Sequence, residues 1–565
     1  MSSNTSKYHL GENARVLAVF FVVVHLFYCT TWQAGFVTDF TGLLERLDGA
    51  PFRDFLKCFG FPALLQVTNF FLFIFYKLFG IHPLPWYLVY TSLHVANGWL
   101  GYLLAKKVFA WGMPKPSHDP SGLGKIGLFF SNISIPAFIV ALLFLLSPYN
   151  AEAVIWKVCF NFLFCTCMML SSLLFLVKYL EGWNRKKMVY SILFFTVALF
   201  TFELALALPF MALAFFFFWR NNVSRVNPSR RRPTLWAIAP YFILSAAYFV
   251  LNKILLGGWV GHYGEGVHLN VDLQNIASNL VKYFSKNLIY WREWPHETKQ
   301  SFIHFCDTPI TAYAFIILGI AVLTVVMIFY KKLNAKIKTA AFTGLLFFMA
   351  LLPVANLYVV WLLHGENDRY GYFASLFFYM GLVAFFGYFN KKVNYILCTA
   401  FLLISIFNLI KINNYWKKST AVIHSLLNDF RWENNSEIYV LAFPENYRGI
   451  PMFKDFSRQN LALKSALKYL ADKSSESQFY QVAQFNMNTP QDGLFEKMVA
   501  TNIIQLEFRE WGSWWWRHGL GTGPYETDHY NFNTTPKGCE ITVEKVAEDA
   551  AFIYSDGGEW REVHF

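Results

Sequence analysis

The sequence predicts an all-α, polytopic membrane domain followed by a small α+β domain. Of its 565 residues, 55% are hydrophobic and only 15% are charged, a balance that a soluble chain of this length does not need. Apolar windows of about twenty residues, the length that crosses a bilayer, recur along residues 1–412. From residue 413 to residue 565 the charge rises and the long apolar runs end, so we place the domain boundary there.

Eleven apolar segments are predicted to be membrane helices. They lie near residues 14–30, 86–108, 124–146, 153–179, 189–201, 204–218, 235–256, 309–330, 340–361, 371–389 and 393–411. A further apolar segment, 61–80, is predicted to lie along or dip into the outer leaflet, because a full crossing would reverse every later loop. Segments 189–201 and 204–218 are short, and they are predicted to form a hairpin with Glu203 at its outer tip.

The net charge of +12 indicates membrane topology rather than a nucleic-acid surface, because the basic residues gather in short clusters between apolar segments. The clusters are Lys106 and Lys107 with Lys115 and Lys125, then Arg185 to Lys187, Arg220 to Arg232, Lys331 to Lys338, and Lys391 with Lys392. Basic loops stay in the cytoplasm, so the N-terminus is expected inside and the C-terminal domain outside. No nucleic-acid partner is expected.

The C-terminal domain alternates strand and helix patterns. "SEIYVLAFP" is typical of a buried strand, and "DFSRQNLALKSALKYLADK" is typical of an amphipathic helix. "GCEITVEKVAEDAAFIYSD" predicts two strands joined by a turn. These patterns predict a small α+β domain.

The acidic residues of the membrane domain converge on the predicted outer face. Asp39 lies with Glu45, Asp48 and Asp54 in the first outer loop, and Glu152 lies in the second. Glu203 caps the hairpin, a loop of about fifty residues (257–308) follows, and Asp368 and Arg369 lie in "HGENDRYGYF". Solvated loops would scatter their acids over both faces, so the pattern indicates an outward-facing polar site.

Such a site suits sugar transfer from a polyprenyl phosphate. A carboxylate such as Asp39 can take the proton of an acceptor hydroxyl while the phosphate leaves from the opposite face of the sugar. The planar fork of Arg369 can bond two oxygens of that phosphate, and the Phe-rich helices can hold the lipid. Two other interpretations of Arg369 stay open: an ion pair with Asp368, or a side chain that extends to the membrane interface.

Five stretches together resemble the protein O-mannosyltransferases and their relatives with a membrane-embedded C-type glycosyltransferase fold. They are "GFVTDF", "LFGIHPLPWYLVYTSLHVANGWLGYLL", "LFLLSPYNAEAVIW", "TFELALALP" and "LLPVANLYVVWLLHGENDRYGYFAS", in this order. The pattern is most similar to the transmembrane mannosyltransferases that carry tetratricopeptide repeats, and to bacterial relatives that lack the repeats. The resemblance covers roughly residues 12–410 and implies a bacterial inner-membrane protein.

The resemblance implies a role for each candidate residue. Asp39 corresponds to one acid of the family's first-loop pair and would be the general base, and Glu152 would orient acceptor or donor sugar. Arg369 would meet the lipid phosphate. The other implied substrate-binding residues are Asp368, Tyr370 and Tyr372 beside it, Glu203 of the hairpin, and His94 at the family's histidine position. From the residues alone, His94 is equally well explained as a buried core histidine.

The chain departs from the family pattern at several positions. Phe40 replaces the second acid, Phe202 replaces the lysine before Glu203, and Ser147 replaces the histidine before a proline. Asp368 stands where glutamate is usual. The family's Tyr-Arg-Pro-Leu is also absent near residues 59–64, which removes an arginine that could contact phosphate.

The predicted function is an inverting transfer of one sugar from a polyprenyl-phosphate donor to a protein, glycan or lipid acceptor at the outer face of the bilayer. No metal and no cofactor are expected; "GHYGEGVHLN" (261–270) has no strong ligand spacing. Three alternatives stay open: a surface-polysaccharide ligase or polymerase, an inactive assembly protein, and a transporter. Transport predicts acids at mid-membrane depth and internal repeats, which the sequence does not display.

Overall fold

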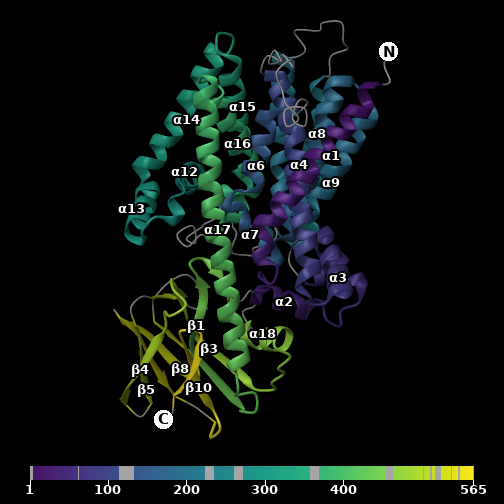
Figure 1. The fold of residues 1–565 in the computed structure, drawn as a ribbon. Coiled ribbons are helices and arrows are strands. Elements are labelled where there is room, and N and C mark those ends of the chain that lie inside the picture. Colours follow the sequence, from purple (N-terminus) through teal and green to yellow (C-terminus); the bar gives the residue numbers. More distant parts are fainter. Residues whose placement is uncertain are drawn as a thin grey trace.

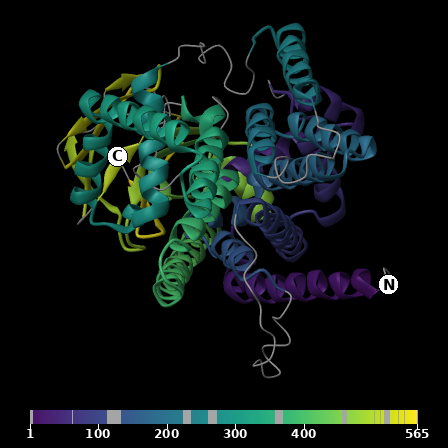
Figure 2. The same cartoon turned by 90° about the horizontal axis from the view of Figure 1, so that it is seen from above.

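The computed structural model describes residues 4–60, 63–112, 133–222, 234–259, 272–356, 368–453, 462–500, 502–509, 512–515, 524–535, 537–544 and 547–563. A bundle of helices stands above a strand-rich C-terminal region, residues 430–563 (Figure 1). Seen from above, teal helices lie over the yellow strands, and the purple and blue helices from the start of the chain lie to one side (Figure 2).

The described helices of the bundle are α1 (Asn4–Tyr28), α2 (Thr38–Leu47), α3 (Gln66–Phe79), α4 (Pro83–Gly112), α6 (Ile135–Leu145), α7 (Ala151–Ile155), α8 (Phe160–Gly182), α9 (Arg185–Leu199), α10 (Leu208–Asn222), α11 (Ala239–Leu256), α12 (Leu273–Ile289), α13 (His296–Asp307), α14 (Pro309–Phe329), α15 (Ala335–Ala355), α16 (Tyr372–Phe386) and α17 (Lys391–Asp429). Short 3₁₀ turns join several of them, among them η3 (Pro148–Asn150), η4 (Lys157–Cys159), η5 (Glu203–Ala207) and η10 (Asp368–Gly371).

Long apolar helices make this a membrane protein. Seven helices of the described chain are long and apolar enough to cross a bilayer, or eight if α6 and the bent segment after it count as one span. α14 is the most lipid-like of them: only 6% of its apolar window is buried, and Ile310 is 83% exposed. The predicted count of eleven is not reached by this criterion: α9 and α16 have only 15 residues each and α6 has 11, and α4, although 30 residues long, is not among the spans.

The segment predicted to be a fifty-residue loop, 257–308, is largely helical where it is described. It forms α12 and α13, and that part of the expectation is wrong. The helix α12 is amphipathic, with Leu273, Ile276 and Leu280 recurring at helical spacing. Its length and polar face do not resemble a membrane span, which is why hydropathy alone reads the segment as a loop.

The C-terminal region contains two sheets and the helix α18 (Ala462–Leu470). The strands are β1 (Glu437–Tyr447), β2 (Ile450–Pro451), β3 (Gln478–Met487), β4 (Leu494–Ala500), β5 (Ile503–Phe508), β6 (Ser513–Trp515), β7 (Tyr525–Glu526), β8 (Tyr530–Thr535), β9 (Gly538–Val543), β10 (Ala551–Asp556) and β11 (Glu559–Val563). One sheet has the order β11-β10-β1-β3-β6, with β10, β1 and β3 parallel, and the other has the antiparallel order β4-β5-β9-β8-β7.

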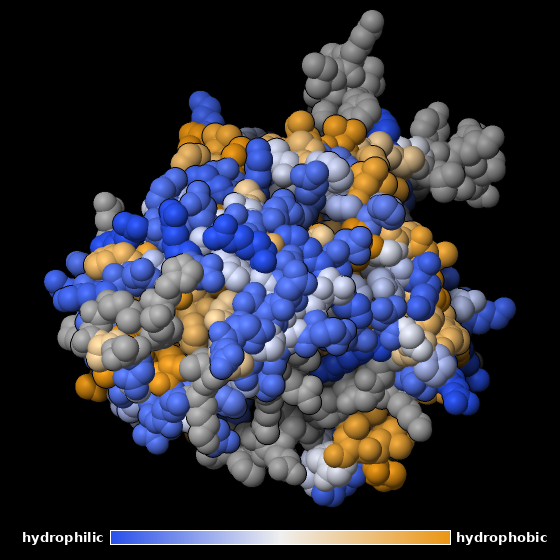
Figure 3. All heavy atoms as spheres, turned by 90° about the horizontal axis from the view of Figure 1, so that it is seen from below, coloured by the Kyte–Doolittle hydropathy of each residue, from blue (hydrophilic) through white to orange (hydrophobic). Residues whose placement is uncertain are grey.

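The predicted strand, amphipathic helix and two later strands all form, as β1, α18, β9 and β10. However, β9 and β10 belong to different sheets rather than to one hairpin. The outer end of this region is largely hydrophilic (Figure 3), in contrast to the exposed apolar side chains of α14. The mostly helical fold with long apolar helices and a sheet-containing C-terminal region is therefore confirmed.

The bundle and the C-terminal region are continuous through α17. This helix has 39 residues, runs through residue 412 without a break and ends at Asp429. Its last turns pack on the sheet, where the indole nitrogen of Trp560 donates to Leu426 O at 2.7 Å. A second contact joins α2 to α18, where the hydroxyls of Thr41 and Ser465 lie 2.8 Å apart.

The turn before α2 packs against the turn after α7 at a glycine. Gly35 has φ +91°, and a Cβ on it would lie 1.9 Å from the carbonyl oxygen of Ile155. The Gly35 carbonyl accepts a 3.1 Å hydrogen bond from the backbone N–H of Lys157. Only glycine permits both this conformation and this approach. The contact brings the segment that carries Asp39 against the segment that carries Glu152.

We predict that Gly35→Ala lowers stability by about 1–3 kcal/mol, because the added methyl group overpacks a buried contact. The control is Gly42→Ala in α2, where a Cβ meets nothing within 4 Å and alanine favours the helix. Thermal unfolding of the purified full-length protein in detergent measures both variants. Equal melting temperatures for the two variants would show that the close approach at Gly35 is not required.

Candidate functional site

Four buried charges form two ion pairs at the turn η10. Arg369 donates from Nη1 to Glu152 Oε1, and its backbone N–H donates to Glu152 Oε2 at 2.9 Å. Asp368 pairs with Lys286 of α12. The side chains of Glu152, Asp368 and Lys286 are at most 5% exposed. The interpretation that paired Arg369 with Asp368 is therefore replaced by two separate pairs, each to a different helix.

Aromatic rings surround both cations. The Arg369 guanidinium carbon lies 4.7 Å from the ring centroid of Trp156 and 4.8 Å from that of Tyr370. Lys286 Nζ lies 5.2 Å from the Tyr149 ring and 5.8 Å from the Trp291 ring. Ring faces attract cations, and more strongly where water is excluded. Arg369 is therefore held by Glu152 and two rings, and does not extend into the interface.

The turn that carries Glu152 is fastened to α16. The chain bends by 52° between α6 and the segment that contains η3 and α7. Across this bend, Ser375 donates to Asn150 Oδ1 at 3.2 Å, and Tyr379 donates to Ser147 Oγ at 2.8 Å. Ser147 thus helps to fix the bend by accepting a hydrogen bond from α16. These bonds hold α7, and with it Glu152, against η10.

His94 and Tyr372 form a separate, fully buried hydrogen-bond network. His94 Nε2 lies 3.1 Å from Leu145 O, so Nε2 carries the proton, since a carbonyl only accepts. The Tyr372 hydroxyl then donates to Nδ1 at 2.7 Å and accepts from Asn97 at 3.1 Å. Both ring nitrogens are thus bonded within the protein, the arrangement of a core histidine. Of the two predicted tyrosines, Tyr370 contacts Arg369 through its ring and Tyr372 contacts His94.

Glu203 begins η5, the turn between α9 and α10, and is half-buried. The preceding Phe202 packs on Phe162 with ring centroids 4.7 Å apart. Phe162 in turn packs on Tyr370 at 5.4 Å and lies 6.0 Å from the Arg369 guanidinium. An aromatic chain therefore connects the hairpin to the site.

The backbone of Asp39 lies in the first turn of α2, and its side chain lies outside the described part of the structure. Its neighbour Phe40 is fully buried, with its ring 5.1 Å from that of Trp86. Phe40 is thus a core residue of the segment that carries Asp39. The Gly35–Lys157 bond holds this segment against the turn after Glu152.

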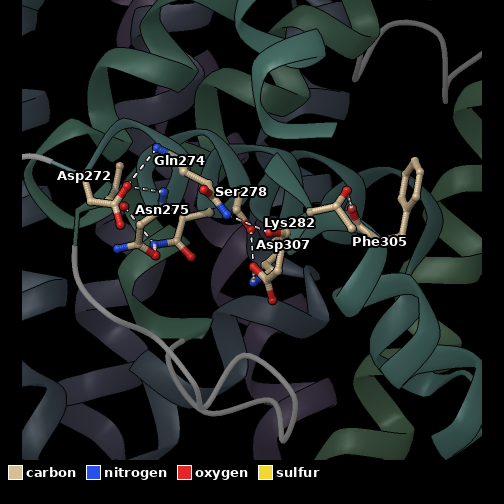
Figure 4. Close-up of polar contacts among 10 residues, drawn as sticks. Asp272, Gln274, Asn275, Ser278, Lys282, Phe305 and Asp307 are labelled. Carbon is tan, nitrogen blue, oxygen red and sulfur yellow. Dashed lines mark hydrogen bonds and ion pairs between the residues drawn. The ribbon is translucent and has the colours of Figure 1, made fainter. Parts of the chain in front are cut away.

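Sequence analysis missed Lys286 and the helix that carries it. Much of the polar face of α12 is buried, including Ser278, Lys282 and Lys286. Figure 4 shows Ser278 and Lys282 of this face directed at Asp307. Ser278 and Lys282 both contact Asp307 Oδ1 at 2.5 Å, and Asn279 donates to Ala355 O at 2.8 Å. Once α12 is recognised as a helix, Lys282 and Lys286 lie four residues apart on one face, and this spacing could have indicated a second set of cations at the site.

No group of three histidine, cysteine, aspartate or glutamate side chains that could hold a metal ion occurs among the described residues. The "GHYGEGVHLN" segment (261–270), considered above for metal binding, lies outside the described residues. No protein-family model matches the chain, and no curated protein matches it.

We predict that Lys286→Met and Asp368→Asn each lower the free energy of unfolding by roughly 3–5 kcal/mol, because either change leaves a buried charge unpaired. The double variant should regain most of the loss, since it removes both charges. Thermal unfolding in detergent measures the stability of wild type, the two single variants and the double variant.

The control is the partly exposed pair Lys107–Glu181, at 2.7 Å with side chains 40% and 28% exposed, whose loss should cost at most about 1 kcal/mol. If Lys286→Met melted no lower than Lys107→Met, the buried pair would not stabilise the fold.

Proposed function

We propose that the protein is an inverting membrane glycosyltransferase of the C-type fold, which transfers one sugar from a polyprenyl-phosphate donor to a protein, glycan or lipid acceptor. The single observation that carries the proposal is the buried Glu152–Arg369 pair between aromatic rings. A bundle of apolar helices has no need of an arginine at this depth for packing alone, and apolar residues of similar volume often serve stability as well. A buried guanidinium beside an aromatic frame suits a phosphate attached to a lipid.

In this mechanism Asp39 accepts the proton of the acceptor hydroxyl as that oxygen attacks the anomeric carbon. The bond from this carbon to the phosphate oxygen breaks on the opposite face, which inverts the configuration. The leaving phosphate gains charge, and Arg369 stabilises it through its paired N–H donors. Glu152 holds Arg369 in place before the donor arrives, and it orients a sugar hydroxyl once the guanidinium turns to the phosphate.

The proposal includes eleven membrane crossings in a bacterial inner membrane, with the N-terminus in the cytoplasm and the C-terminal region outside. Support comes from the positions of the basic clusters. Lys106 pairs with Glu12 near the start of α1, and Lys336 of α15 donates to Gly387 O near the start of α17. These ends of the helices lie opposite the C-terminal region in Figure 1. The site side of the bundle then faces outward.

The second candidate is an inactive assembly protein with the same fold. Its specific support is Phe40, because a fully buried phenylalanine takes the place of an acid in the first outer loop. In that case the two ion pairs serve only to join α7, η10 and α12. Measurements of catalysis separate the two functions.

We predict that Asp39→Asn lowers turnover by about a hundredfold or more, the range for loss of a general base, and leaves donor affinity nearly unchanged. The assay is sugar transfer from polyprenyl-phosphate hexoses to an endogenous acceptor in membranes containing the full-length protein. The double variant Glu152→Gln with Arg369→Gln removes both charges of the pair together and should lose donor affinity and turnover. Transfer by wild-type membranes no greater than by membranes that lack the protein would favour the assembly protein.

We predict that cysteines placed at Lys186 and Lys331 react only from the cytoplasmic side, and a cysteine at Ser474 of the C-terminal region only from outside. All three positions are exposed, and the exposed Cys29 is first replaced by serine. Membrane-impermeant labelling of whole cells and of inverted vesicles measures the sidedness. Reaction of position 474 only in inverted vesicles would overturn the orientation and the outward-facing site.

A further inference from the structure

Lys157 is a buried cation that the proposed mechanism does not use. It follows Trp156 at the end of α7 and is 1% exposed. Its Nζ lies 5.1 Å from the Tyr90 ring centroid and 5.8 Å from that of Phe36. Across the described residues, we find no carboxylate paired with this ammonium group and no hydrogen-bond acceptor on its Nζ.

An ammonium group removed from water without an opposite charge is strongly unfavourable, and ring faces offset only part of that cost. The other two cations at the site are each matched, Arg369 by Glu152 and Lys286 by Asp368. Among these five described groups the charges do not cancel, because Lys157, Arg369 and Lys286 face only Glu152 and Asp368. A surplus positive charge enclosed by protein favours the binding of an anion.

Lys157 lies where the two halves of the site meet. Its backbone N–H donates to Gly35 O, in the turn that leads to Asp39, and its carbonyl accepts from the Tyr90 hydroxyl. The residue before it, Trp156, stacks on the Arg369 guanidinium. The backbone on both sides of Lys157 is thus fixed, so its side chain enters a preorganised environment built by α4 and the turn before α2.

We propose that Lys157 binds the phosphate of the lipid-linked sugar donor, as a second cation in addition to Arg369. This inference rests on the proposed function and adds the residue that recognises the anion. A lysine is suited to the task as a point charge, and its aromatic and apolar surroundings suit the adjoining polyprenyl chain. The charge is retained at a cost in stability of the empty protein, as is common for binding sites.

The test uses the purified full-length protein, with undecaprenyl phosphate and the uncharged undecaprenol as probes. Wild type should be stabilised against heat by the phosphate and not by the alcohol, since only a ligand that binds the folded state raises the melting temperature. Lys157→Met should melt at the same temperature as wild type or higher without lipid, and should bind the phosphate at least about tenfold more weakly. Lys157→Arg should retain most of the binding.

The matched control is Lys178→Met, the same substitution near the other end of α8, at an exposed position; it should bind undecaprenyl phosphate as wild type does. Wild-type affinity in Lys157→Met would overturn the role of Lys157 and leave the proposed function standing. A wild type that binds undecaprenol as well as undecaprenyl phosphate would overturn the proposed function itself. A loss of turnover in Lys157→Met with unchanged phosphate binding would assign Lys157 to positioning Asp39 instead.

Discussion

The requirement that a charge inside an apolar bundle must have a partner governs the arrangement around η10. Two consecutive residues of this turn, Asp368 and Arg369, form ion pairs in different directions, one with α12 and one with α7. A single turn therefore joins helices that are more than a hundred residues apart in sequence. If either pair were broken, a buried charge would remain, so the positions of the three elements are set together.

Around these pairs the structure uses two further devices. Hydrogen bonds from α16 fix the bend before Glu152. The close contact between Gly35 and Ile155 holds the segment before α2 against the end of α7. Aromatic rings fill the space between the charges, as Trp156 and Tyr370 do for Arg369. Hydrogen bonds thus fix the orientation of the helices and turns, and aromatic rings exclude water. Exclusion of water strengthens each electrostatic contact inside the site.

The sequence predicted those features that depend on apolar length and on the placement of charge. Long apolar helices and the strand-rich C-terminal region follow from hydropathy and periodicity. Hydropathy and periodicity do not predict which charges pair. Adjacency along the chain suggested an Arg369–Asp368 pair, whereas in the structure Arg369 pairs with Glu152. Lys286 and α12 were missed because the polar face of that helix is buried, the reverse of the usual pattern.

The uninterrupted α17 has a geometric consequence for the C-terminal region. At about 1.5 Å of rise per residue, its 39 residues span roughly 58 Å, so one rigid rod extends from the far side of the bundle to the sheet. Each residue also turns the rod by about 100°, since a helix has about 3.6 residues per turn. The distance of the sheets from the bundle and the direction in which they face are therefore coupled. Inserting or deleting one residue in this helix would rotate the sheets by about 100°, whereas inserting or deleting seven would nearly preserve their direction at a new distance.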